Sequence, residues 1–152
     1  MIRRSDDRVW IAEPNTTSYY LLGEGITELH ETCKTALLET PHIDTAVCTR
    51  EILYHTAQIE FEGYRTGDTA MRILRSKYLK RGKDALITLV IGNLHDAGTT
   101  ALQARRVKGY VCLENPGTGE GVMGSRVKGK IVYASEPEEG IFNEDTKEFI
   151  VL

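Results

Sequence analysis

Alternation of apolar and polar residues marks a long strand between residues 50 and 63. Every second position of this stretch is largely apolar: Leu53, His55, Ala57, Ile59 and Phe61. Mostly polar residues fill the positions between them, and successive side chains of a strand point to opposite faces. The pattern therefore predicts a strand with one buried face, and it predicts that His55 lies in the core.

A helical period replaces the alternation after Gly63. Four residues share one side of the predicted helix, at spacings of three, four and seven: Ala70, Met71, Leu74 and Tyr78. Asp68 suits the helix N-terminus, because its carboxylate can cap free backbone N–H groups there. Lys80 and Arg81 suit the last turn, and Gly82 suits the left-handed position that follows a helix. We therefore expect one helix that ends just before Gly82.

Strand patterns account for most of the remaining chain. A short apolar run at 85–91 predicts a strand buried on both faces. The other expected strands are 9–12, 18–22, 103–114 and 126–134. A glycine-rich turn joins the last two, so we expect them to pair. The segments 140–142 and 148–151 flank a polar loop and predict a C-terminal hairpin at about 140–151.

The stretch of about 33–50 is predicted to be an extended arm. Ala36, Leu37 and Leu38 could start a helix, but Pro41 and the threonines resist one. A segment without a clear period buries too little surface to offset the entropy cost of ordering it. We therefore expect this arm to be mobile in the free protein until a neighbouring subunit packs against it.

A single domain spanning 1–152 is the default for a chain of this length, which can bury a real core. The apolar runs are far shorter than the roughly 18 residues that a membrane helix needs. Residues 1–9 are charged rather than signal-like, so we expect neither a standard secretion signal nor a membrane partner. Cys33, Cys48 and Cys112 are an odd number of cysteines, which favours free thiols in a reducing compartment.

Basic residues concentrate in the predicted helix. The segment 65–83 holds seven of the 19 basic and one of the 22 acidic residues, which leaves 12 basic and 21 acidic residues elsewhere. A nucleic-acid-binding protein would use such a helix to contact phosphates. However, the basic residues lie all round this helix and show no interleaving with aromatic residues. A solvated helix near acidic neighbours is the better interpretation.

Three glycines, Gly119, Gly121 and Gly124, have the spacing of a dinucleotide-binding loop and follow a predicted strand. That motif needs a helix N-terminus to hold the pyrophosphate, whereas 126–134 is patterned as a strand. We therefore expect a hairpin loop and no nucleotide cofactor.

Four potential zinc ligands lie within nineteen residues: His30, Cys33, His42 and Cys48. Structural zinc sites present two tight ligand pairs, and the step from His42 to Cys48 is looser than that. Cys33 and Cys48 fit better as small buried residues. We therefore expect no metal site.

No residue pattern identifies a catalytic site. The four histidines are dispersed, and no serine or cysteine lies in a recognisable nucleophile motif. Glu60 and Glu62 share one strand face, but such carboxylates are commonly solvated, and no apolar pocket that would raise a pKa is evident. We therefore name no catalytic residue and expect no enzyme activity.

Several segments follow one another in an order that a known family shares. The first are YYLLGEGITEL at 19–29, a polar threonine-rich arm, and the strand ILYHTAQIEFEGY at 52–64. The helix GDTAMRILRSKYLKRG at 67–82 and the strand ALITLVIG at 85–92 come next. The ending at 121–152 adds a V.G.I strand, an acidic bend and a closing hairpin with G.F....K.F. In this order the chain resembles the tail tube proteins of tailed bacteriophages and of related phage-tail-like particles.

The resemblance implies a mainly β fold with one α-helix, a β-sandwich or barrel of the phage tail tube type. It also implies a structural virion protein that assembles with itself into six-membered rings, which stack into a tail tube in the cytoplasm of a bacterial host. The tape-measure protein and DNA pass through the lumen of such a tube. A small β-barrel that binds a ligand, an enzyme, and a non-polymerising tail initiator or terminator stay open as alternatives.

A tube that conducts DNA also constrains the charge of its wall. A basic wall would retard DNA, because each neutralised phosphate adds affinity. We therefore expect an acidic or neutral wall, with the basic helix outside the inner sheet. Glu60 and Glu62 are candidates for that wall.

Overall fold

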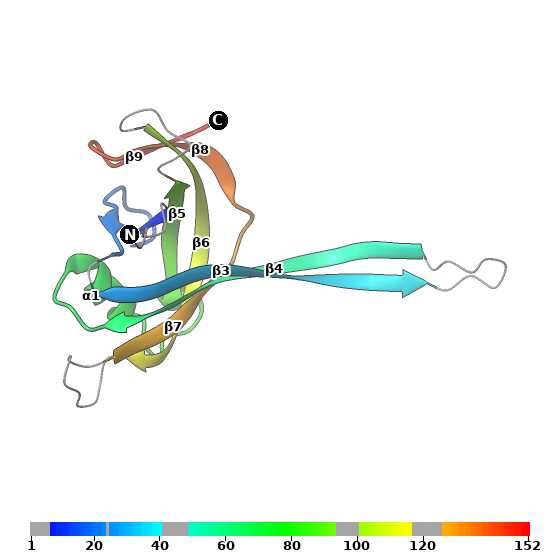
Figure 1. Ribbon diagram of the computed structural model, residues 1–152, viewed down its shortest axis with the longest axis horizontal. Helices are drawn as coiled ribbons and strands as arrows, with labels where there is room; N and C mark the ends of the chain where they lie inside the picture. Colours follow the sequence, from blue (N-terminus) through cyan, green and yellow to red (C-terminus); the bar gives the residue numbers. More distant parts are fainter. Residues whose placement is uncertain (1–6, 24, 41–48, 94–100, 117–125) are drawn as a thin grey trace, which may run out of the picture.

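The computed structural model describes residues 7–23, 25–40, 49–93, 101–116 and 126–152. This part of the chain has nine strands, the α-helix α1 (Thr69–Ser76) and the short 3-10 helix η1 (Gly82–Ala85). The strands are β1 (Asp7–Ala12), β2 (Tyr20–Leu21), β3 (Ile26–Thr40), β4 (Thr49–Tyr64), β5 (Leu86–Asn93), β6 (Ala101–Pro116), β7 (Arg126–Tyr133), β8 (Glu138–Asn143) and β9 (Glu148–Val151). The prediction of a mainly β fold with one α-helix is confirmed (Figure 1). No described helix has the length and apolar character that crossing a bilayer requires.

All nine strands belong to one open antiparallel sheet. Its order is β2-β1-β5-β6-β7-β4-β3, and β8 and β9 extend it from β6. One edge of β6 pairs with β5. The other edge pairs with β8 along residues 101–106 and with β7 along residues 109–116. The predicted pairing of the strands on either side of the glycine-rich turn is therefore confirmed, and β6 joins the two halves of the sheet.

Strands β1 and β5 are buried on both faces. On one face, Val9 and Leu89 lie in a core cluster with the buried side of α1. On the other face, Trp10 and Val90 lie in a second cluster with Phe142 of β8. Because neighbouring residues of one strand enter different clusters, α1 and the β8–β9 hairpin cover opposite faces of the sheet. The apolar run in β5 is thus buried on both sides, as predicted.

Phe142 joins the C-terminal hairpin to the body of the domain. Its side chain is fully buried, and its ring centroid lies 4.6 Å from that of Trp10 and 5.6 Å from that of Tyr19. The Arg106 guanidinium lies 4.7 Å from the ring centroid of Phe149 in β9. Aromatic pairs such as Phe142–Trp10 contribute about 0.5–1.5 kcal/mol beyond the area that they bury. The hairpin is therefore part of the packed core.

Helix α1 ends earlier than the sequence pattern predicts. Asp68 takes the N-cap position as expected, but its side chain makes no capping hydrogen bond and accepts one from the Thr66 hydroxyl instead. The last helical residue is Ser76. The next turn places Leu79 in the left-handed region at φ 61°, and Gly82, at φ 56°, opens η1 instead of closing α1. The prediction of a helix that ends just before Gly82 is wrong, because the buried residues of α1 are confined to Ala70, Met71, Ile73 and Leu74. Tyr78 is 38% exposed, so no buried surface supports another turn.

The two longest strands, β3 and β4, form a hairpin that projects far from the body (Figure 1). β4 pairs with β7 only from Gln58 to Tyr64, so the outer parts of β3 and β4 pair only with each other among the described strands. This outer hairpin, residues 33–40 and 49–57, includes the described part of the predicted arm. It continues the ladder of the inner sheet without a break in pairing at its root.

The alternating face of β4 is buried only where β7 flanks the strand. Ile59 and Phe61 are 2% exposed, whereas Leu53 is 55% exposed and His55 is also exposed. His55 Nδ1 forms a 2.9 Å hydrogen bond with the hydroxyl of Thr35 across the outer hairpin. The prediction of a core histidine is therefore wrong, because the alternating pattern continues beyond the body that could cover it.

Three polar side chains fix the hairpin at the point where it leaves the body. Glu31 of β3 accepts hydrogen bonds from the Tyr133 hydroxyl of β7 and, over 3.1 Å, from Arg105 of β6. Burial raises the pKa of Tyr133, and the nearby Glu31 carboxylate raises it further, so the phenol stays protonated and donates this bond. Neither β6 nor β7 is a sheet neighbour of β3. These contacts therefore add a connection across the curved sheet that backbone pairing does not provide.

Replacing Phe142 with alanine should lower the free energy of unfolding by about 3–5 kcal/mol, because it empties a fully buried site. Truncation after Glu139 should unfold the domain. The adjacent change Ile141→Ala is the matched control: this side chain is 37% exposed, and its loss should cost about 1 kcal/mol or less. Urea unfolding followed by circular dichroism measures all three. A truncated chain with an unchanged melting temperature would contradict this role of the hairpin.

Candidate functional site

The outer hairpin carries a cluster of exposed apolar side chains. We call it the arm patch: Leu37, Leu38, Ile52, Leu53 and Tyr54. Their exposed fractions run from 45% for Leu38 to 61% for Ile52. Leu37 lies opposite Ile52, and a register shift beside this pair leaves Leu53 without a cross-strand partner. Single exposed apolar residues are common, but a group of them on one projecting element is typical of a protein–protein contact.

The outer hairpin also has two open edges. No described strand pairs with β4 beyond Gln58, and none pairs with the outer edge of β3. Backbone N–H and C=O groups on an open edge can pair with a strand of another chain. A two-stranded hairpin on its own is at best marginally stable in water. Contact with another chain would therefore stabilise the outer hairpin through both its backbone and its apolar side chains.

A second polar surface lies on the inner part of the sheet, on the face away from α1. We call it the charged ladder: Glu28, His30, Glu60, Glu62, Glu114, Arg126, Lys128 and Lys130. In the register of β4 with β7, Glu60 lies opposite Lys130 and Glu62 lies opposite Lys128. Opposite charges at such positions stabilise a sheet by roughly 0.2–1 kcal/mol for each pair. The sequence singled out both glutamates, and the structure adds that each of them faces a lysine.

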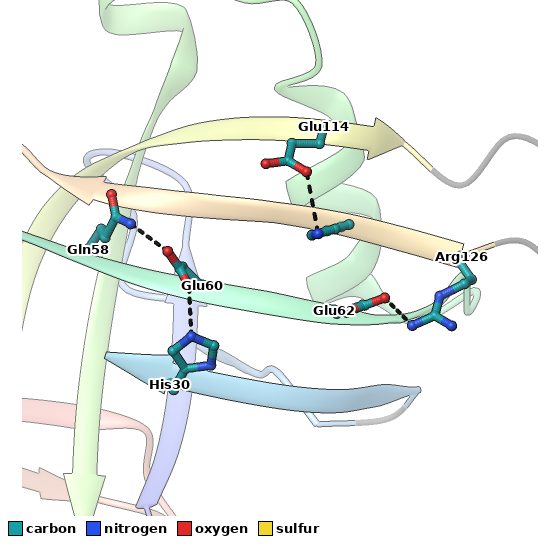
Figure 2. A network of polar contacts seen from close by, with 7 residues as sticks. His30, Gln58, Glu60, Glu62, Glu114 and Arg126 are labelled. Carbon is teal, nitrogen blue, oxygen red and sulfur yellow. Dashed lines mark hydrogen bonds and ion pairs between the residues drawn. The ribbon is translucent and has the colours of Figure 1, made fainter. Parts of the chain in front are cut away.

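Figure 2 shows how the carboxylates of the ladder are engaged. Glu62 forms an ion pair with Arg126, and Glu114 lies 3.7 Å from the Lys128 ammonium. Glu60 has the most partners: Oε2 lies 2.6 Å from His30 Nε2, and Oε1 accepts a 2.7 Å hydrogen bond from Gln58. Mutual pairing of this kind leaves few of the ladder's charges without a partner within the chain.

The environment of Glu60 keeps this carboxylate ionised. The hydrogen bond with His30 holds the pKa of Glu60 below its ordinary value of 4.5, and Gln58 and Lys130 act in the same direction. Desolvation acts in the opposite direction and does not cancel these effects. A general acid needs a raised pKa at neutral pH, so this environment suits an ion-pair partner and not an acid catalyst.

The candidate zinc ligands do not converge in the described chain. His30 and Cys33 are three residues apart on β3, which places their side chains on opposite faces of the strand. Cys33 is exposed, so its interpretation as a buried residue is wrong. Outside the described residues lie His42, Cys48, Gly119, Gly121 and Gly124. Within the described ranges, no three His, Cys, Asp or Glu side chains form a group that could hold a metal ion.

Sequence patterns identify only part of these two surfaces. Leu37 and Leu38 stand out in the sequence because they interrupt a polar stretch, and this is a usable signal for the arm patch. Ile52 and Tyr54 carry no such signal, because they continue the pattern of a half-buried strand. The ladder depends on which residues face each other, and that register is a property of the folded sheet.

Replacing His30 with alanine should raise the pKa of Glu60 toward 4.5, because it removes the largest lowering influence. The folded pKa of Glu60 is depressed, so the ionised carboxylate stabilises the fold above pH 4.5, and this contribution is lost as the pH falls below that value. NMR titration of the Glu60 side-chain carbon measures the shift. Thr35→Ala, on the same strand, should leave it unchanged. A Glu60 pKa that stays depressed without His30 would refute this assignment.

The chain matches no family model, and no curated protein matches it. The geometry and chemistry of the arm patch and the charged ladder therefore carry the case for a function.

Proposed function

We propose that the protein is a structural subunit that assembles with copies of itself into stacked six-membered rings, which form the tail tube of a bacteriophage or a related particle. The observation that carries this proposal is the projecting β3–β4 hairpin, with its arm patch and two open edges. The order of segments that resembles the tail tube proteins supports it independently. In such a tube the hairpin would lie against a neighbouring subunit.

The energetics of the hairpin favour a permanent partner over a solvated state. Full burial of a Leu or Ile side chain contributes on the order of 1.5–3 kcal/mol. The five side chains of the arm patch could therefore contribute several kcal/mol to a contact, in addition to backbone pairing along β3 or β4. Ring symmetry multiplies this contribution, because every subunit of a closed ring offers one hairpin and receives another.

The charged ladder has properties that suit the inner wall of a tube. Its basic side chains, Arg126, Lys128 and Lys130, each lie beside a glutamate of the same chain. Cations that are already paired bind phosphates less strongly, so DNA could slide past them. α1 packs on the opposite face of these strands, in the cluster that holds Phe61 and Ile131. With the ladder facing the lumen, the basic residues of α1 would lie on the outside.

The alternative to a self-assembling subunit is a non-catalytic protein that binds a ligand. A shallow groove lies over the ladder, lined by Glu60, Phe61 and Lys130 among others. A ligand in this groove would have to displace ion pairs, which raises the cost of binding. Binding of a ligand would also leave the arm patch without a role. Assembly accounts for both surfaces, and a non-polymerising tail initiator or terminator would account for them equally, since it would form single rings.

Purified protein should form rings or tubes in negative-stain electron micrographs, and the double variant Leu37→Ser, Ile52→Ser should stay folded but associate on the order of 10- to 100-fold more weakly. Sedimentation velocity measures the association. Leu21→Ser is the matched control, because Leu21 is 41% exposed on β2, outside the hairpin. A wild-type protein that stays monomeric at all concentrations would overturn the proposal in favour of the binding protein. Single rings without stacking would favour an initiator or terminator.

Hydrogen exchange should distinguish the outer hairpin from the body of the domain. In a verified monomer, amides of residues 33–40 and 50–57 should exchange much faster than those of β5, because only one partner strand protects them. In the assembled form the same amides should become protected. Mass spectrometry of peptides from both states measures the difference. Strong protection of the outer hairpin in the monomer would contradict the need for a partner.

A further inference from the structure

A compact basic surface follows α1. The turn between α1 and β5 presents Lys80, Arg81 and Lys83, all of them exposed, and we call it the basic turn. The ion pairs within the described chain involve other residues, so none of these three cations is paired with a described carboxylate. Leu79, which is 80% exposed, adds an apolar contact point beside them.

A surface of opposite charge lies on the C-terminal hairpin. Residues 136–148 include six acidic residues and one basic residue. Among these, Asp145 and Glu148 lie at the β8–β9 turn, are exposed and form no ion pair with a described residue. Ile150 and Leu152, which are 62% and 76% exposed, supply apolar surface at the same hairpin. We call this region the acidic hairpin surface. Like the basic turn, it combines exposed charges, here negative, with exposed apolar side chains.

These two surfaces cannot neutralise each other within one chain. The basic turn leads into Leu86, the first residue of β5, and Leu86 pairs with Tyr110 of β6. The β8–β9 turn begins after Asn143, which pairs with Ala101 at the other end of β6. Nine residues of β6 separate these two points, roughly 30 Å at about 3.3 Å per residue. This separation is several times the screening length of about 8 Å at physiological salt.

We propose that the basic turn of one copy docks on the acidic hairpin surface of the next copy, as a head-to-tail contact distinct from the arm patch. This rests on the proposed self-assembly and names a second surface for it. Two different surfaces that complement each other make a heterologous contact, which closes into a ring or propagates as a stack. Complementary charge sets the register and speeds association, and the apolar side chains on both surfaces add buried area.

A second copy of the chain explains the two surfaces better than an anionic polymer does. A nucleic acid would engage the basic turn but would leave the acidic hairpin surface unexplained. A second copy uses both surfaces at once. The contact also requires the acidic surface to lie far from the basic one, and pairing with opposite ends of β6 separates them.

Paired charge reversals test this contact. The variant Lys80→Glu, Arg81→Glu and the variant Asp145→Lys, Glu148→Lys should each associate at least about tenfold more weakly than the wild type, measured by sedimentation velocity at about 0.05 M salt. An equimolar mixture of the two variants should regain association, because each then offers surfaces that fit the other. Wild-type association should weaken as salt rises to about 0.5 M.

The charge-preserving variant Lys80→Arg, Arg81→Lys is the control and should associate as the wild type does. Circular dichroism establishes that each variant is folded. Unchanged association of both reversed variants would overturn the head-to-tail contact while leaving self-assembly through the arm patch intact. Weak association of the reversed variants without recovery in the mixture would also overturn it. Binding of a DNA duplex by the basic turn, with self-association unaffected by its reversal, would assign the turn to nucleic acid instead.

Discussion

Burial of β1 and β5 on both faces is the constraint on which the rest of this domain depends. Val9 and Ile11 face one core cluster, whereas Trp10 and Ala12 face the other. A strand with two apolar faces cannot lie at a solvent-exposed surface, so the chain has to supply a cover for each side. α1 supplies one cover and β8–β9 supplies the other. Because α1 and β8–β9 lie on opposite faces of the sheet, their polar sides and the charged residues there point in different directions.

The hairpin obeys a different constraint. Its inner part belongs to the sheet and buries Ile59 and Phe61, whereas its outer part has only a single pair of strands. The contacts of Glu31 with Tyr133 and Arg105 lie at the boundary between the inner and the outer part of the hairpin. They tie the hairpin to strands beyond its own sheet neighbours, so they resist bending at its root. Because the β3–β4 hairpin is held rigidly where it leaves the body, its outer end points in a defined direction, although that end has little stability of its own.

Most strands and the helix N-terminus could be predicted from the sequence, because both depend on local patterns. The apolar run in β5 and the capping position of Asp68 are signals that nearby residues determine. The failures have a shared physical cause. The end of α1 and the exposure of His55 depend on where the covering elements stop, and sequence period carries no information about that limit. The charged ladder depends in the same way on cross-strand register, which long-range pairing sets.

The only tryptophan of the chain has a particular place in this arrangement. Trp10 is fully buried against Phe142, and its indole N–H has no hydrogen-bond partner among the described residues. Indole emission is sensitive to the polarity of its surroundings, so this side chain should emit as an apolar, desolvated group in the folded domain. Trp10 belongs to β1 and contacts Phe142 of β8, so its fluorescence reports docking of the C-terminal hairpin. The outer hairpin lies far from this site, so ordering of the arm in an assembly would leave the emission unchanged. A change in this emission would therefore report undocking of the C-terminal hairpin and would not be confused with ordering of the arm.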